Sequence, residues 1–111
     1  MNSMAWNEVG GMSNDFRSAR FWAAEIIENA LQPGARAVDA TLGNGHDALW
    51  LCNLVGERGH VYGFDVQREA VDRSAARLAE NGVSDRATLI CDGHQNMLAY
   101  VDEESIDAVM F

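Results

Sequence analysis

A short apolar run that ends in an acid and continues into two closely spaced glycines constrains this chain most. Residues 36–40 read Arg-Ala-Val-Asp-Ala after a Pro33-Gly34 breaker, which suits a strand buried on both faces. Gly43 and Gly45 allow a tight turn, and the helical composition that follows Asp47 predicts a helix whose first N–H groups face a ligand. The stretch therefore predicts a binding turn for a nucleotide-like cofactor.

The alternation of apolar runs and helical stretches repeats along the chain. Helices are expected over residues 15–32, 48–55, 68–81 and 93–100, and strands over 36–40, 60–66, 86–92 and 106–111. In the third helix Val71, Ala75, Leu78 and Ala79 are expected to face inward, and in the short fourth helix Met97 and Leu98. Strands that alternate with helices through short loops imply right-handed crossovers and a parallel sheet. The expected class is a Rossmann-like α/β sandwich.

Composition favours one ordinary globular domain. The chain has 111 residues, 48% of them hydrophobic, and a single proline, so we expect a mobile arm over residues 1–14 and one domain over 15–111. It shows no signal peptide and no run long enough to span a membrane, which predicts a cytoplasmic protein. Cys52 and Cys91 are interpreted as buried thiols, and the histidine spacings predict no metal site.

The net charge of −9 bears on possible partners, and all eight basic residues are arginine. An acidic field repels nucleic acid at long range, so an RNA substrate would need a local arginine patch or a partner surface. Arg17 and Arg20 lie one turn apart, and they are interpreted as part of the solvated face of the first helix.

An acidic residue follows each of three successive predicted strands, and these acids favour one of two candidate cofactors. Asp39, Asp65 and Asp92 fall where open α/β sheets bind their ligands. Residues 43–48 fit G-x-G-x-x-A, and Asp65 follows at the spacing of about 20 residues expected for an acid that holds ribose hydroxyls, which would suit NAD. However, Asp39 and Asp47 would lie beside a pyrophosphate, whereas carboxylates attract the sulfonium and ammonium of S-adenosylmethionine. We expect S-adenosylmethionine, with an NAD-dependent oxidoreductase as the alternative.

These residues resemble a known family. The pattern D-x-T-x-G-x-G from Asp39 to Gly45 resembles motif I, D-x-G-x-G-x-G, of class I S-adenosylmethionine-dependent methyltransferases, with Thr41 in place of the first glycine. Together, DATLGNGHD, VGERGHVYGFDVQ and CDGHQNM resemble the putative rRNA methylase (YtqB-like) family, whose members include tRNA wobble-uridine methyltransferases. The resemblance runs from about Phe16 to Phe111 and implies a three-layer sandwich of strand order 3-2-1-4, with tRNA or rRNA as the substrate.

The resemblance also implies a division of the cofactor site. Asp39, Gly43 and Gly45 would hold the methionyl part, Asp65 the ribose, and Asp92 with Gly93 the adenine. His94 would line the adenine or substrate side, or else cap the short helix. The full set of cofactor-binding residues implied is Asp39, Thr41, Gly43, Asn44, Gly45, His46, Asp47, Asp65, Gln67, Asp92, Gly93 and His94. Replacing Asp65 by alanine is expected to abolish cofactor binding with little loss of stability.

The resemblance further implies that the residues orienting the methyl acceptor lie beyond Phe111, so the chain is expected to carry the cofactor half of the fold. The fourth strand would then form an edge with Met110 and Phe111 exposed, through which a homo-oligomer could complete the sheet. A cofactor-binding module without activity of its own is a further alternative.

Overall fold

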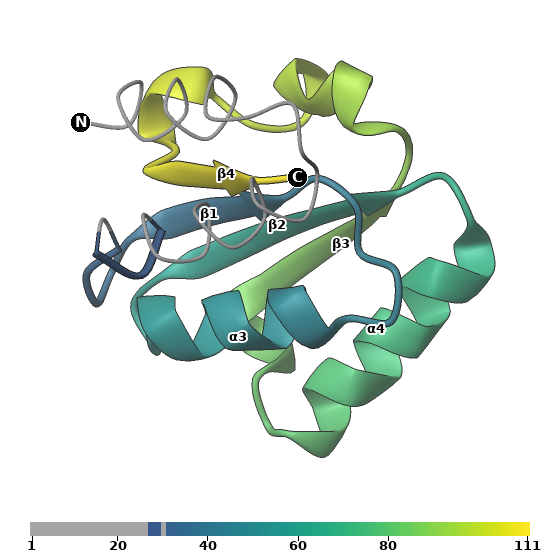
Figure 1. Ribbon diagram of the computed structural model, residues 1–111, viewed down its shortest axis with the longest axis horizontal. Helices are drawn as coiled ribbons and strands as arrows, with labels where there is room; N and C mark the ends of the chain where they lie inside the picture. Colours follow the sequence, from purple (N-terminus) through teal and green to yellow (C-terminus); the bar gives the residue numbers. More distant parts are fainter. Residues whose placement is uncertain (1–26, 30) are drawn as a thin grey trace.

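The computed structural model describes residues 27–29 and 31–111, which form one parallel sheet with helices packed against it (Figure 1). The arm expected over residues 1–14 and most of the helix expected over 15–32 lie outside the described residues. Residues 27–29 are helical, as expected, and Ile27 is fully buried.

Four parallel strands form the sheet in the order β3-β2-β1-β4. They are β1 (Arg36–Asp39), β2 (His60–Asp65), β3 (Ala87–Cys91) and β4 (Ala108–Met110). Val38 of β1 pairs with Tyr62 of β2 and with Val109 of β4, and Asp65 of β2 pairs with Cys91 of β3. Each strand is an apolar run of residues that favour extended backbone, so the predicted strands and their order are confirmed.

Helices lie on both faces of this sheet. The chain continues from β1 into α3 (His46–Val55), from β2 into α4 (Arg68–Glu80) and from β3 into the short 3-10 helices η2 (His94–Ala99) and η3 (Glu103–Ser105), with η1 (Ser84–Arg86) before β3. Figure 1 shows α3 and α4 on one face, and the segment that holds η2 and η3 runs along the other. The described residues therefore form the layers expected of a Rossmann-like fold.

A separate apolar core fills each interface between layers. On one side, Leu51 of α3 and Leu78 of α4 pack with Val61 of β2. On the other side, Val38 and Phe64 pack with residues that include Ile106, which follows η3. Alternate residues of the buried strands supply the two cores, as a sheet covered on both faces requires.

The rotation of α4 differs from the expected one. Ala75 and Ala79 are exposed, whereas Ser74 is fully buried together with the expected Val71 and Leu78. Ser74 lies where α4 meets the glycine turn, so close that a Cβ on Gly45 would lie 2.8 Å from Cα of Ser74.

Three smaller expectations are also wrong. Leu98 is 64% exposed because η2 is a 3-10 helix that turns Met97 alone toward the core. Met110 is buried because β4 pairs in register with β1 and places this side chain in the α3 core, although Phe111 is exposed as expected. Cys91 is exposed, whereas Cys52 is buried, and both thiols are free.

Candidate functional site

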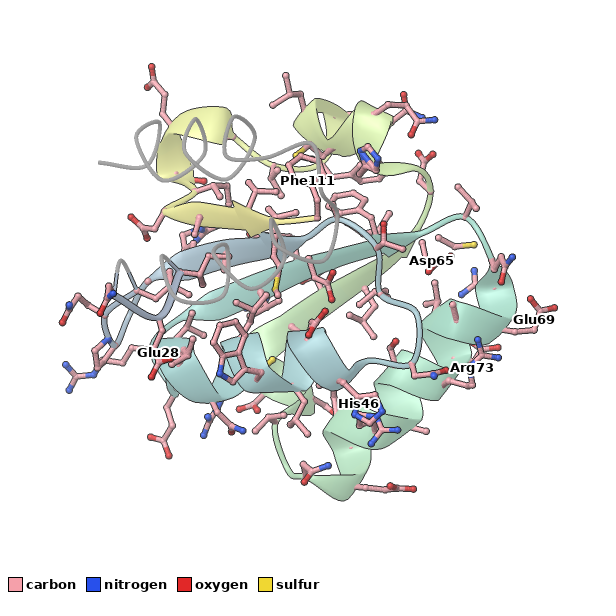
Figure 2. The ribbon with its side chains drawn as sticks, in the orientation of Figure 1. Glu28, His46, Asp65, Glu69, Arg73 and Phe111 are labelled. Carbon is pink, nitrogen blue, oxygen red and sulfur yellow. The ribbon has the colours of Figure 1, made fainter. Side chains whose placement is uncertain are left out.

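The carboxyl ends of the strands bring the three predicted acids to one edge of the sheet. Asp39 ends β1, Asp65 ends β2 in register with Cys91, and Asp92 follows β3 directly. Figure 2 shows Asp65 and Phe111 at this same end of the sheet. The edge is therefore lined by acids from three neighbouring strands, as the sequence predicts.

Two of these acids hold the glycine turn between β1 and α3. Oδ1 of Asp39, which is only 2% exposed, accepts the N–H of Thr41 at 3.2 Å. Oδ2 of Asp65 accepts the N–H of Gly43 at 3.0 Å, and its Oδ1 accepts the N–H of Gln67 at 2.9 Å. A carboxylate oxygen has two lone pairs, so each oxygen of Asp65 retains the capacity to accept a hydroxyl donor from a ligand.

The two glycines of the turn serve different purposes. Gly43 has φ +56° and open space where a side chain would stand, so it leaves room for a ligand at the turn. Gly45 has φ +86°, and a Cβ there would lie 2.8 Å from Cα of Ser74. Gly45 therefore allows close packing of the turn against α4, and the open approach for a ligand lies at Gly43.

Helix α4 contacts this turn through two arginines and a serine that the sequence did not predict as site residues. Nε of Arg73 donates to Oδ1 of Asn44 at 3.0 Å, and Nε of Arg77 donates to the Asn44 carbonyl at 2.8 Å. The Ser74 hydroxyl donates to the carbonyl of Gly43 at 3.4 Å. Figure 2 shows Arg73 on α4 beside the start of α3, which carries His46. The spacing of two arginines one helical turn apart was the available signal.

Asp92 sits in a hydrogen-bond network that the sequence did not predict. Its Oδ1 accepts the Gly93 N–H at 2.7 Å and Nδ2 of Asn96 at 2.9 Å, and its Oδ2 accepts the Tyr100 hydroxyl at 2.8 Å. The Tyr100 ring packs edge-on against Phe64, with 5.8 Å between centroids. The hydrogen bonds from Asn96, Tyr100 and the Gly93 backbone lower the pKa of Asp92, and the contact with Asp92 raises the pKa of Tyr100.

The remaining predicted residues lie around this edge. His94 begins η2, and its ring lies edge-on to Phe111 with 5.5 Å between centroids, so it links the segment after β3 to the end of β4. His46 is exposed as the first residue of α3, and Asp47 is half-buried beside it. Gln67 is exposed and precedes α4.

Two features of the described residues bear on metals and membranes. Residues 27–29 and 31–111 hold no group of three His, Cys, Asp or Glu side chains placed to bind a metal ion. Within the same part of the chain, no helix combines the length and the apolar character needed to cross a membrane.

Comparisons with known proteins agree with this geometry. A parallel sheet of order 3-2-1-4 with a glycine turn after its first strand is Rossmann-like, and the solved structures similar in fold include rRNA methylases and an S-adenosylmethionine-dependent O-methyltransferase. A family model described as "Putative rRNA methylase" matches residues 61–111. The resemblance found in the sequence is confirmed, and the chain is related to the putative rRNA methylases.

Two solved structures and one curated protein illustrate the relationship. The putative rRNA-methylase from Clostridium thermocellum is 41% identical, with a TM-score of 0.70 over 82% of this chain and 47% of that one. An rRNA methylase from Streptococcus thermophilus is 35% identical, with a TM-score of 0.65 over 73% of this chain and 43% of that one. Ribosomal RNA small subunit methyltransferase H of Streptococcus equi subsp. equi (strain 4047) is 27% identical over 88% of this chain. The chain spans 31% of that protein and about half of each solved relative.

Proposed function

We propose that this chain is the cofactor-binding part of an S-adenosylmethionine-dependent methyltransferase that acts on RNA. The observation that carries the proposal is the acid-lined edge of the sheet, where Asp39 and Asp65 hold a turn that is open at Gly43 and Asp92 follows β3. Carboxylates favour a ligand with a sulfonium and an ammonium over one with a pyrophosphate. The relationship to the putative rRNA methylases supports the same cofactor and substrate class.

The donors and acceptors at this edge fit the parts of S-adenosylmethionine. Asp65 has an acceptor position left on each oxygen after binding the turn, which suits the two ribose hydroxyls, with Gln67 beside it. The open side of Gly43 lets the backbone approach the methionyl part. Buried Asp39 accepts the Thr41 N–H at the turn, Gly45 packs the turn against α4, and the rim residues Thr41, Asn44, His46 and Asp47 complete this side of the site.

The adenine side is assigned to the segment after β3. Oδ2 of Asp92 binds one donor, Tyr100, and so retains an acceptor position for an exocyclic amino group. Gly93 and His94 follow Asp92 directly in the chain, and the ring of His94 lies edge-on to that of Phe111. We assign His94 to the wall of the adenine or acceptor side.

The chemistry divides between the cofactor and the protein. Bound S-adenosylmethionine supplies an electrophilic methyl group, and the described residues bind and orient it, so their contribution is positioning and charge complementarity. Groups that orient the methyl acceptor are expected in the remaining part of the relatives' fold, beyond the positions that match Phe111. Association of two copies through the β4 edge stays a prediction.

The acceptor is proposed to be a base of tRNA, such as a modified wobble uridine, or of rRNA. An acidic protein of net charge −9 needs locally placed cations or a partner surface to hold a polyanion, so binding should weaken steeply as salt rises. If the acceptor is tRNA or rRNA, we expect the protein in the cytoplasm, where both RNAs are made and modified in bacteria.

Calorimetric titration tests the cofactor. We expect S-adenosylhomocysteine to bind and NAD not to bind, and we expect Asp65→Asn to weaken S-adenosylhomocysteine by about tenfold or more, because the amide replaces one acceptor with a donor. Asp72→Asn is the matched control, since Asp72 is exposed on α4 and pairs with Arg68 at 3.9 Å. Tighter binding of NAD, or an Asp65→Asn variant that binds like wild type, would refute the proposal.

Methyl transfer to RNA tests the acceptor class. Total tRNA and rRNA from a strain that lacks the gene would be incubated separately with the protein and labelled S-adenosylmethionine, and nucleosides would then be identified by mass spectrometry. Label in one modified nucleoside supports an RNA acceptor. Label that enters only protein or small molecules would contradict it.

A further inference from the structure

The glycine turn is held from α4 as well as from the strand ends. Arg73 and Arg77 lie on the side of α4 that faces the turn, and their Nε atoms donate to the side-chain oxygen and the backbone carbonyl of one residue, Asn44, at 3.0 and 2.8 Å. Asn44 stands between Gly43 and Gly45, which are the two positions with positive φ in this turn. The two arginines therefore act on the part of the turn with the greatest backbone freedom.

We propose that Arg73 and Arg77 are positioning residues of the cofactor site, which they hold in its binding conformation by fixing Asn44. The inference rests on the proposed function, because the turn matters for affinity only if the cofactor binds there. Neither arginine needs to touch the cofactor, since each acts through Asn44. They hold one side of the turn while Asp65 holds the other through the Gly43 N–H at 3.0 Å.

Loss of either hydrogen bond should lower affinity more than stability. Arg73 and Asn44 are exposed and Arg77 is half-buried in an exposed hydrogen bond, so water reaches the groups released by a substitution and the cost to folding is small. A turn with two glycines then samples other conformations, and the apparent affinity falls by the fraction of molecules that keep the binding conformation. This separation of affinity from stability distinguishes a positioning residue from a structural one.

Two substitutions at Arg77 of similar length differ only in whether they keep a hydrogen-bond donor. Glutamine places its Nε2 the same number of bonds from Cα as Nε of arginine, so Arg77→Gln keeps a donor for the Asn44 carbonyl. Arg77→Met has similar length and apolar bulk but no donor. Both variants remove the charge, so the difference between them reports the hydrogen bond alone. Arg68→Met is the matched control on the same helix, because Arg68 is an exposed arginine that pairs with Asp72 at 3.9 Å.

The measurement is the Kd of S-adenosylhomocysteine by calorimetry, together with Tm for each variant. We expect Arg77→Met to raise Kd about tenfold, Arg77→Gln and Arg68→Met to stay within about twofold of wild type, and Tm to change little in all three. Arg73→Met should behave like Arg77→Met, with Arg73→Gln restoring the affinity. Amide hydrogen exchange of the free protein should show faster exchange at Asn44 and Gly45 in the methionine variants only.

The outcomes separate this inference from the proposed function. If wild-type protein fails to bind S-adenosylhomocysteine, the proposed function falls and the inference falls with it. If wild type binds and Arg77→Met binds equally well, or if Arg77→Gln loses as much affinity as Arg77→Met, the inference alone is overturned.

Discussion

Replacement of Gly45 by alanine should destabilise the fold far more than replacement of another glycine with positive φ. At Gly45 φ is +86°, and a Cβ would lie 2.8 Å from Cα, 3.0 Å from Oγ and 3.1 Å from Cβ of Ser74. The nearest of these atoms belongs to the backbone of α4, which cannot rotate away. Relief therefore requires α3 and α4 to move apart, and this opens the core that both helices share.

The magnitude follows from two separate terms. The left-handed conformation costs alanine about 1 kcal/mol or somewhat more, and overpacking against a fixed backbone costs about 1–3 kcal/mol. The sum is about 3 kcal/mol, which is a large part of the roughly 5–15 kcal/mol that stabilises a domain of this kind. Gly82→Ala isolates the first term, because Gly82 has φ +71° and nothing within 4 Å of its missing Cβ.

Urea unfolding followed by circular dichroism at 222 nm measures the difference. With a slope of about 2 kcal/mol per molar urea, Gly45→Ala should unfold roughly 1 M earlier than Gly82→Ala. Gly43→Ala adds a comparison at the site, since it should cost as little stability as Gly82→Ala and yet weaken S-adenosylhomocysteine, because its open side faces the proposed ligand. Equal midpoints for Gly45→Ala and Gly82→Ala would show that the contact with Ser74 costs nothing and would refute the packing argument.

Two further predictions concern titration and thiol chemistry. Hydrogen bonds from Asn96 and Tyr100 hold the pKa of Asp92 below 3.8, so this carboxylate stabilises the fold above pH 3.8, and its contribution is lost as pH falls through its pKa in the folded protein. Carbon-13 NMR should show a higher pKa for Asp92 in Tyr100→Phe, and an unchanged pKa would contradict the role of this hydrogen bond. Burial raises the pKa of the Cys52 thiol to about 11, whereas Cys91 is exposed. Ellman's reagent at pH 8 should therefore label one thiol in the folded protein and two in urea. Rapid labelling of two thiols in the folded protein would refute the burial of Cys52.

The sequence predicted the features that depend on local patterns. The apolar run before Asp39 and the similar run before Asp65 favoured buried strands, and their alternation with helices through short connections favoured a parallel sheet. The strand order and the gathering of the acids follow from this topology together with the family resemblance. The assignment of those acids to particular parts of the cofactor stays a prediction.

The contacts made by α4 could not be predicted in the same way. Ser74, Ala75 and Ala79 are all small, so the apolar pattern allows more than one rotation of the helix about its axis. The observed rotation brings Ser74 against Gly45, which lies 29 residues earlier in the sequence, and Gly45 permits this close approach because a Cβ there would lie 2.8 Å from Cα of Ser74. With this contact in place, Arg73 and Arg77 reach Asn44 from the rim of α4, so a packing contact between distant parts of the sequence accompanies the hydrogen bonds that hold the turn.

The role of Asp65 shows why binding and folding must be measured together at this site. The sequence predicted that Asp65→Ala would remove cofactor binding with little loss of stability, but its carboxylate also accepts the N–H groups of Gly43 and Gln67. Alanine would release both, at a cost of about 1 kcal/mol for each hydrogen bond, and would free the turn even before any ligand is considered. Asp65→Asn keeps one acceptor oxygen for the turn, so its loss of affinity reports on the ligand more directly. By the same reasoning, a bound cofactor should stabilise the turn and raise the Tm of the protein. The increase in Tm caused by S-adenosylhomocysteine should be smaller than in wild type for any variant that removes the hydrogen bond to the Gly43 N–H.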